Sequence, residues 1–275
     1  MKKSCPICFH HCALENGEIG FCRARKNQDG VIIPINYGKI TSISLDPIEK
    51  KPLRQFYPGK KILSVGSFGC NLRCPFCQNY EISMAEEKQC EQIFCMPEEL
   101  AEKAEQLVPR GNIGLAYTYN EPLVGYEFVQ DCAEKIHAKN LKNVLVTNGT
   151  ICKEPLQELL SLIDAANVDL KAFTPQFYEK IAGNLEVVKE TIQMMADHCH
   201  LEVTTLVIPG ENDGIEEMKE LSFWLSSVRC DIPLHITRFF PRYQFKNYPP
   251  TPVETIERLC ETAREFLEYV YPGNC

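Results

Sequence analysis

The feature that most constrains the fold is a regular alternation of strand-like and helix-like segments, which begins near Lys60. Six short apolar runs are each followed by segments with helical spacing. The strand-like runs are 61–69, 112–119, 143–149, 166–173, 200–210 and 232–240, and the helical ones are 96–108, 122–140, 154–163, 174–198, 214–228 and 253–270. This alternation predicts an α/β fold with parallel strands and right-handed crossovers. Six units predict a partial (β/α)6 barrel rather than a complete eightfold one.

The residues before this pattern have a different character. They are loop-rich and contain cysteines, so we expect an N-terminal segment over 1–58 and the barrel over 59–275. Residues 31–46 predict a short hairpin, and the prolines and charges of 46–59 predict a surface loop.

Composition excludes several classes of function. The net charge of −8 comes without a basic stripe, so we expect no nucleic-acid partner. The first residues have no apolar core and no run approaches membrane-spanning length, so we expect no signal peptide and no membrane. The 15 cysteines predict metal or catalytic chemistry in a reducing cytoplasm, because disulfides are rare there. Sulfur-ligated iron would account for many of them and suggests an anaerobic setting.

Polar or reactive side chains follow the predicted strands where each one ends. In parallel barrels these ends open on one face, where catalysis normally takes place. The alternative is that loops are polar in any case. The residues are Cys70, Asn120, Glu121, Thr147, Asn148, Asp169, Lys171, Asn212 and Arg238.

After the first strand comes what we call the cysteine loop, with Cys70, Cys74 and Cys77 in a C-x3-C-x2-C spacing. Three thiolates can hold three irons of a [4Fe–4S] cluster and leave the fourth iron open to a small molecule. Pro75 and Phe76 would give the sulfurs apolar cover. The alternative is a zinc site or a structural thiol cluster.

This loop and its surroundings resemble the radical S-adenosylmethionine (radical SAM) superfamily. The segments "LDPIEKKPL", "GCNLRCPFCQNYEIS", "YTYNEP", "VTNGT", "VDLKAF", "LVIPGEND" and "HITRFFP" are similar to those of AmmeMemoRadiSam-system enzymes, relatives of pyruvate formate-lyase activating enzyme. The resemblance covers essentially the whole chain. It implies that the open iron binds SAM and that one electron cleaves SAM to methionine and a 5′-deoxyadenosyl radical. The radical would then abstract hydrogen from an unknown substrate, which we expect to be a protein or peptide.

The resemblance also implies a set of SAM-binding residues. Its Gly-Gly-Glu segment corresponds to Tyr119, Asn120 and Glu121, so both glycines are replaced here. Its Thr-Asn-Gly and Asp-x-Lys segments correspond to 147–149 and 169–171. The implied cofactor-binding residues are Phe76, Tyr119, Asn120, Glu121, Asn148, Asp169 and Lys171.

Other positions depart from the activating enzymes. Val146 stands where they carry an aspartate that helps to hold a monovalent cation, and Thr204 replaces an arginine. The first change puts that cation site in doubt, and the second weighs against a glycyl-radical activase, which stays open as an alternative. His235 and Arg238, from the last strand, are the candidates to face substrate.

A second group, the N-terminal cysteine set, consists of Cys5, Cys8, Cys12 and Cys22 in a C-x2-C-x3-C-x9-C spacing. Four thiolates suit zinc, a single iron or a second iron–sulfur cluster, and His10 or His11 could replace one thiolate. Zinc would only staple a segment without its own core, whereas a redox cluster would relay electrons or bind substrate.

Two classes of function therefore remain. The first is a radical SAM oxidoreductase reduced by a small flavodoxin- or ferredoxin-like partner, as the resemblance implies. The second is an iron–sulfur electron-transfer or metal-binding module without SAM chemistry.

Overall fold

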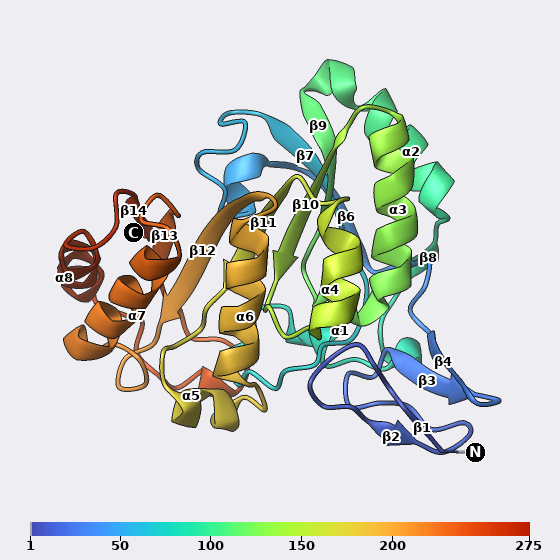
Figure 1. Ribbon diagram of the computed structural model, residues 1–275, viewed down its shortest axis with the longest axis horizontal. Coiled ribbons are helices and arrows are strands. Elements are labelled where there is room, and N and C mark those ends of the chain that lie inside the picture. Colours follow the sequence, from blue (N-terminus) through green and yellow to red (C-terminus); the bar gives the residue numbers. More distant parts are fainter. Residues whose placement is uncertain (1) are drawn as a thin grey trace.

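The computed structural model describes residues 2–275 and contains one eight-stranded sheet with helices along one side (Figure 1). The strand order is β14-β13-β12-β11-β10-β9-β7-β6. All neighbouring pairs are parallel except β6 with β7. Because β6 and β14 are the two edges, the sheet is not closed into a barrel. The α/β prediction of an incomplete barrel is confirmed.

The strands of this sheet are β6 (Ser42–Pro47), β7 (Lys61–Gly66), β9 (Asn112–Tyr117), β10 (Lys142–Thr147), β11 (Ala165–Asp169), β12 (His200–Val207), β13 (Leu234–Arg238) and β14 (Val270–Gly273). The helices are α1 (Tyr80–Ser83), α2 (Pro97–Gln106), α3 (Tyr126–Ala138), α4 (Lys153–Leu160), α5 (Pro175–Lys180), α6 (Leu185–Ala196), α7 (Ile215–Val228) and α8 (Val253–Ala263). Short strand pairs complete the fold: β1 (Lys3–Ser4) with β2 (Ala13–Leu14), β3 (Arg25–Gln28) with β4 (Val31–Pro34), and β5 (Lys39–Ile40) with β8 (Ile93–Phe94).

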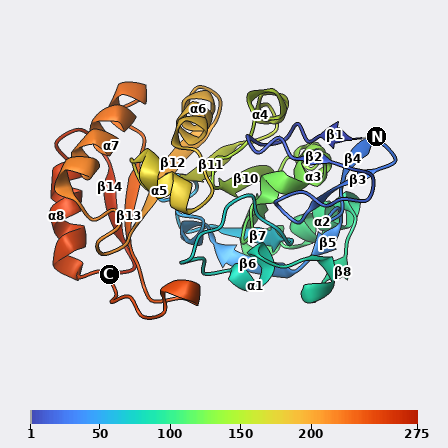
Figure 2. The same ribbon diagram turned by 90° about the horizontal axis from the view of Figure 1, so that it is seen from below.

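Each strand lies next to the one before it in the chain, so every crossover packs its helix on the same side (Figure 2). Alternate side chains, such as Leu63, Leu115 and Leu145, join the large core beneath these helices. The other side chains face the concave side of the sheet. This arrangement leaves the concave side free to form a site.

A loop between β6 and β7, which we call the base loop (48–60), covers the lower part of the concave side. Its Ile48 and Leu53 are fully buried in a small cluster with Ile62, Val144 and Ala165. The surface loop predicted over 46–59 is therefore wrong in part, because apolar residues of this segment fill the bottom of the barrel.

Two further expectations need correction. The hairpin predicted over 31–46 does not form: β4 pairs with β3, and β6 joins the main sheet beside β7. The last helix ends at Ala263 rather than at Val270, and β14 follows as an additional parallel strand. In the part of the chain that the structure describes, the helices are too short or too polar to cross a membrane.

Candidate functional site

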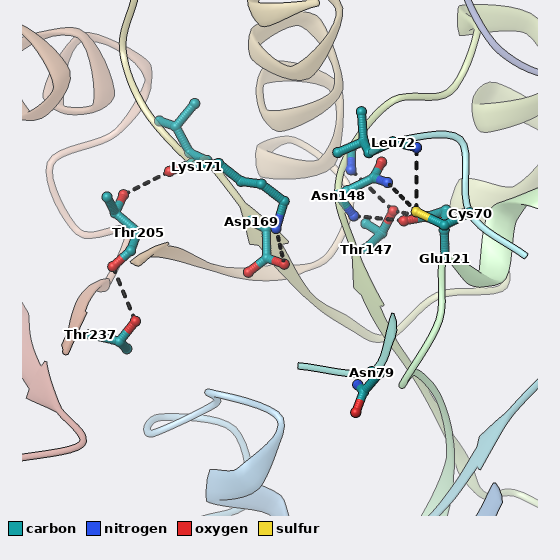
Figure 3. A network of polar contacts seen from close by, with 12 residues as sticks. Cys70, Leu72, Asn79, Glu121, Thr147, Asn148, Asp169, Lys171, Thr205 and Thr237 are labelled. Carbon is teal, nitrogen blue, oxygen red and sulfur yellow. Dashed lines mark hydrogen bonds and ion pairs between the residues drawn. The ribbon is translucent and has the colours of Figure 1, made fainter. Parts of the chain in front are cut away.

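A cavity of about 510 Å³ opens at the carboxyl ends of the parallel strands. This volume falls in the range of small-molecule sites, about 300–1,000 Å³. All three cysteines of the cysteine loop line it, together with every residue expected from the resemblance to bind cofactor. These residues are Cys70, Cys74, Cys77, Phe76, Tyr119, Asn120, Glu121, Asn148, Asp169 and Lys171. Figure 3 shows two polar groups, one around Cys70 and one at Asp169 and Lys171.

The cysteine loop is held in place by glycine and by amide donors. Gly69 has φ +89°, and a Cβ on it would lie 2.6 Å from the carbonyl oxygen of Cys22. The Cys70 Sγ accepts hydrogen bonds from the Leu72 backbone N–H at 3.4 Å and the Asn148 amide at 3.6 Å. Donors of this kind stabilise a thiolate rather than a thiol.

Burial works in the opposite direction on the bare thiols. It raises the pKa of Cys74 to about 12, and it raises the pKa of Cys70 well above its ordinary value, with Glu121 adding to the effect. Thiolates here need a positive partner such as a metal centre. No fourth cysteine and no histidine lines the cavity, counting residues 2–275. The donor set thus fits a cluster with three protein ligands and one open position.

Glu121 lines the cavity and is 3% exposed. Its carboxylate accepts from the Thr147 hydroxyl at 2.7 Å and from the backbone N–H groups of Asn148 (2.8 Å) and Leu123 (3.1 Å). Burial nevertheless raises the pKa of Glu121 to about 7, against these hydrogen bonds. Glu121 therefore ties the ends of β9 and β10 together beside the cysteine loop.

The neighbouring Asn120 also serves the loop. Its Oδ1 accepts from the Ser67 backbone N–H at 2.9 Å, and its amide donates to the backbone oxygens of Phe68 and Gly69. Tyr119 before it has φ +71° and takes a hydrogen bond on its carbonyl from Asn79. The segment that replaces the family's glycines thus forms part of the frame around the cysteines.

The opposite wall carries an ion pair. Lys171 Nζ lies 2.9 Å from Asp169 Oδ2. Burial would lower the pKa of Lys171, but Asp169 and Cys74 outweigh it, so the net shift is upward and the lysine is charged. Thr204 lines the same wall, and its buried hydroxyl has no hydrogen-bond partner among residues 2–275. Both groups can therefore bind a polar ligand.

The two residues proposed to face substrate do not line this cavity. His235 is buried at the base of the sheet, where its Nε2 lies 2.6 Å from Glu202 Oε2. The Arg238 guanidinium donates to the carbonyl oxygen of Thr251 and lies over the ring of Phe240. Their role in facing substrate has no support in these positions.

Sequence reasoning missed the floor of the cavity. Glu49, Lys50 and Pro52 of the base loop line it. Below them Asp46 accepts from Lys51 at 2.8 Å and from the Tyr119 hydroxyl at 2.7 Å. The signal for this floor is the "LDPIEKKPL" segment, which belongs to the resemblance but carries no residue role there.

The N-terminal cysteine set gathers around a second, small cavity. All four of its cysteines line this cavity, together with His10 and Arg25. His11 lies apart, with its Nε2 4.0 Å from the sulfur of Cys152. Between Lys2 and Cys275, no three His, Cys, Asp or Glu side chains are grouped as the ligands of a single metal ion.

Comparisons with known proteins agree with this geometry. The sequence profile of the Radical SAM superfamily matches residues 64–222. The Methanocaldococcus jannaschii protein MJ0808 is 41% identical over 280 residues, which span 99% of this chain and 81% of that protein. MJ1227 of the same organism is 26% identical over 230 residues, 78% of this chain and 89% of its own; its name assigns it, provisionally, to the glycyl-radical enzyme activating enzymes.

Among solved structures, a domain of pyruvate-formate lyase-activating enzyme from Bacteroides vulgatus ATCC 8482 is similar, with a TM-score of 0.52. The identity is 16%, and the match covers 58% of this chain and 99% of that domain. At this identity the likeness shows a shared fold.

Proposed function

The chain belongs to the radical SAM superfamily, and on that premise we propose that it cleaves SAM reductively in the cavity of the cysteine loop. The resulting 5′-deoxyadenosyl radical would then abstract hydrogen from a protein or peptide. The observation that carries the proposal is the placement of Cys70, Cys74 and Cys77 in one cavity with an ion pair and a buried carboxylate on its walls.

The chain's own residues would hold both cofactors. The cysteine loop would bind a [4Fe–4S] cluster, which supplies the electron that breaks the S–C5′ bond of SAM. Lys171 is a charged donor on the wall opposite Cys70 and would bind the SAM carboxylate. The Thr204 hydroxyl would hydrogen-bond to SAM as well, which would satisfy its unpartnered oxygen.

Glu121 would act as a positioning residue. Three of its acceptor sites are used by Thr147, Asn148 and Leu123, which fixes the carboxylate at one place on the wall. A remaining lone pair would accept from the SAM amine, and a positive amine there would favour the ionised carboxylate.

The proposed substrate is a macromolecule because MJ1227 is named, provisionally, as an enzyme that activates another enzyme. A glycyl-radical activase of the pyruvate formate-lyase type is the second candidate, and the same relative favours it. Val146 and Thr204, which replace the aspartate and the arginine of those enzymes, weigh against it.

We further propose a small flavodoxin- or ferredoxin-like protein as the reductant. We also propose a cytoplasmic location, because none of the 15 cysteines forms a disulfide and a reducing compartment keeps them unpaired.

The test is SAM cleavage under anaerobic conditions. The chain is reconstituted with iron and sulfide and reduced with dithionite, and 5′-deoxyadenosine and methionine are then measured. We expect both products in equal amounts, and none from a Cys74→Ala variant. Cys230→Ala is the matched control, because Cys230 is an exposed thiol outside both cavities.

Spectroscopy separates this function from an electron-transfer module. Direct binding of SAM to an open iron should change the electron paramagnetic resonance (EPR) spectrum of the reduced cluster. A spectrum that SAM leaves unchanged, with no 5′-deoxyadenosine formed, would reject the enzymatic proposal.

A further inference from the structure

We propose that the N-terminal cysteine set holds a second iron–sulfur cluster, which passes electrons to the cysteine loop. The metal site itself is independent of the proposed function, whereas its role as an electron donor rests on it.

The four thiols of the N-terminal set are arranged around one small cavity. Cys5, Cys8 and Cys12 lie in the loop between β1 and β2, Cys22 lies between β2 and β3, and all four line the cavity. Four cysteine thiolates around one cavity can hold an iron–sulfur cluster, which takes one cysteine at each corner.

A buried arginine lies at this cavity. Arg25 is 2% exposed and lines the cavity. One end of its guanidinium donates to Glu127 at 2.5 and 2.8 Å and to the carbonyl oxygen of Val124 at 3.1 Å. Its Nε has no hydrogen-bond partner anywhere in the described chain.

A buried N–H without an acceptor is costly, because it has lost its hydrogen bond to water. A cluster with four thiolate ligands is an anion whose sulfurs accept hydrogen bonds. Arg25 would satisfy its free N–H on such a sulfur and balance part of the charge. Glu127 already balances the charge at the other end of the guanidinium, whereas four neutral thiols would leave the Nε–H without a strong acceptor.

The two cysteine groups are in direct contact. The Cys70 backbone N–H donates to the carbonyl oxygen of Cys22 at 3.1 Å. The ring of His10 lies with its Nε2 2.9 Å from the backbone oxygen of Asn71, and the Asn71 side chain accepts from Asn148. One ligand of each group is thus joined to the other by a single backbone hydrogen bond. Two clusters in these places would be close neighbours.

The proposed transfer moves one electron in two steps. The small reductant gives one electron to the second cluster. That cluster is reoxidised when it passes the electron to the cluster of the cysteine loop. No bond forms or breaks and no proton is required in this transfer. The electron finally enters SAM, as the proposed function requires.

Three double variants of the full-length protein test the metal site. Cys8→Ser/Cys12→Ser removes two ligands of the N-terminal set, and Cys70→Ser/Cys74→Ser removes two of the loop. Cys230→Ser/Cys275→Ser changes two exposed thiols and is the control. After anaerobic reconstitution, iron, sulfide and zinc are counted per chain, and Mössbauer and EPR spectra are recorded.

We expect about eight irons per chain in the wild type and the control, and about four in each of the other two variants. The Cys70→Ser/Cys74→Ser variant tests the second metal site even if the N-terminal variant fails to fold, because it keeps the N-terminal cysteine set intact. It should retain a cluster whose EPR spectrum does not respond to SAM. About four irons with one zinc in the wild type, or no iron in the loop variant, would overturn the proposal.

Proximity has its own readout. When both clusters are reduced, their spins should interact, so the wild-type EPR spectrum should be broader than the sum of the two variant spectra. With a flavodoxin as reductant, the N-terminal variant should form 5′-deoxyadenosine at least tenfold more slowly than the control. Additive spectra, or equal rates with flavodoxin, would refute the electron transfer while SAM cleavage itself would stand.

Arg25→Lys tests the contact with arginine while keeping a positive charge. Loss of the Nε donor should move the midpoint potential of the second cluster to more negative values and leave that of the loop cluster unchanged. An unchanged potential of the second cluster would show that Arg25 does not face it.

Discussion

The substitution Glu202→Gln tests how the base loop is fastened under the cavity. Glu202 on β12 is fully buried. Its carboxylate lies 2.9 Å from the ring nitrogen of His200 and 2.6 Å from that of His235. It also accepts from the backbone N–H groups of Arg54 and Gln55 at 2.9 and 2.8 Å. The glutamine side chain would place its NH₂ group, which is a donor, against a group that also donates, so at least one of these hydrogen bonds would be lost.

The magnitude follows from the carboxylate's ionisation. Burial by itself would raise the pKa of Glu202, but the hydrogen bonds, led by that of His200, lower it to about 2. An ordinary glutamate is near 4.5, so the difference corresponds to about 3 kcal/mol of stabilisation at neutral pH. Because the folded-state pKa is the lower one, this stabilisation is complete above about pH 5 and is lost as the pH falls toward 2.

The measurement is urea unfolding of both proteins from pH 7 to pH 3. We expect Glu202→Gln to be less stable by about 3 kcal/mol at pH 7, with a melting temperature about 6–12 °C lower. The difference in unfolding free energy between the two proteins should narrow below pH 4. Glu186→Gln is the matched control, since that side chain is 74% exposed and should change stability by less than about 0.5 kcal/mol. Equal stability of Glu202→Gln and wild type at pH 7 would refute the reasoning.

Three more predictions concern the cavity. Gly69→Ala should lose iron and about 3 kcal/mol of stability, because a backbone oxygen lies 2.6 Å from the new Cβ; Gly17→Ala, with the same left-handed φ but open space, should keep its iron. Asp169→Asn should lower the free energy of unfolding by about 2 kcal/mol, since Lys171 loses the carboxylate 2.9 Å away. It should also weaken SAM binding in equilibrium dialysis, and unchanged binding would contradict this. The raised pKa of Glu121, about 7, means that its stabilising effect is complete below pH 4.5 and is lost as the pH rises through 7. The urea midpoint of the wild type should therefore decrease as the pH rises from 5 to 8, while that of Glu121→Gln stays nearly level. The same pH dependence in both proteins would contradict this prediction.

The sequence predicted the repeating part of the fold because that part depends on local patterns. Each parallel strand is an apolar run with turn residues at its end, and each helix has the spacing of an amphipathic face. The errors fall where pairing is decided at long range. β6 reads as half of a hairpin, but its partner is β7, which lies beyond the base loop. β14 follows α8 so closely that its residues continue the helical pattern.

The site was predictable to the same extent. Cys70, Glu121 and Lys171 line one cavity because parallel strands bring their carboxyl ends to one edge, while their roles stay predictions. The resemblance supplied the residues, but it could not supply their partners. Asn120 was expected to help bind SAM, and the structure shows its amide donating to backbone oxygens of the cysteine loop.

His235 and Arg238 show why a position near a strand end is weak evidence by itself. His235 lies on the concave side, as a substrate-facing residue must, but it sits one pleat lower than Thr237, which reaches the cavity. At that depth the buried Glu202 engages it. His235 and Thr237 differ only in their position along β13, one lying in the core and the other at the cavity. Where the core ends and the cavity begins depends on how far the base loop extends between the strands. The apolar Ile48 and Leu53 set that level from below, so the boundary between core and cavity follows from a loop whose sequence resembles an exposed turn.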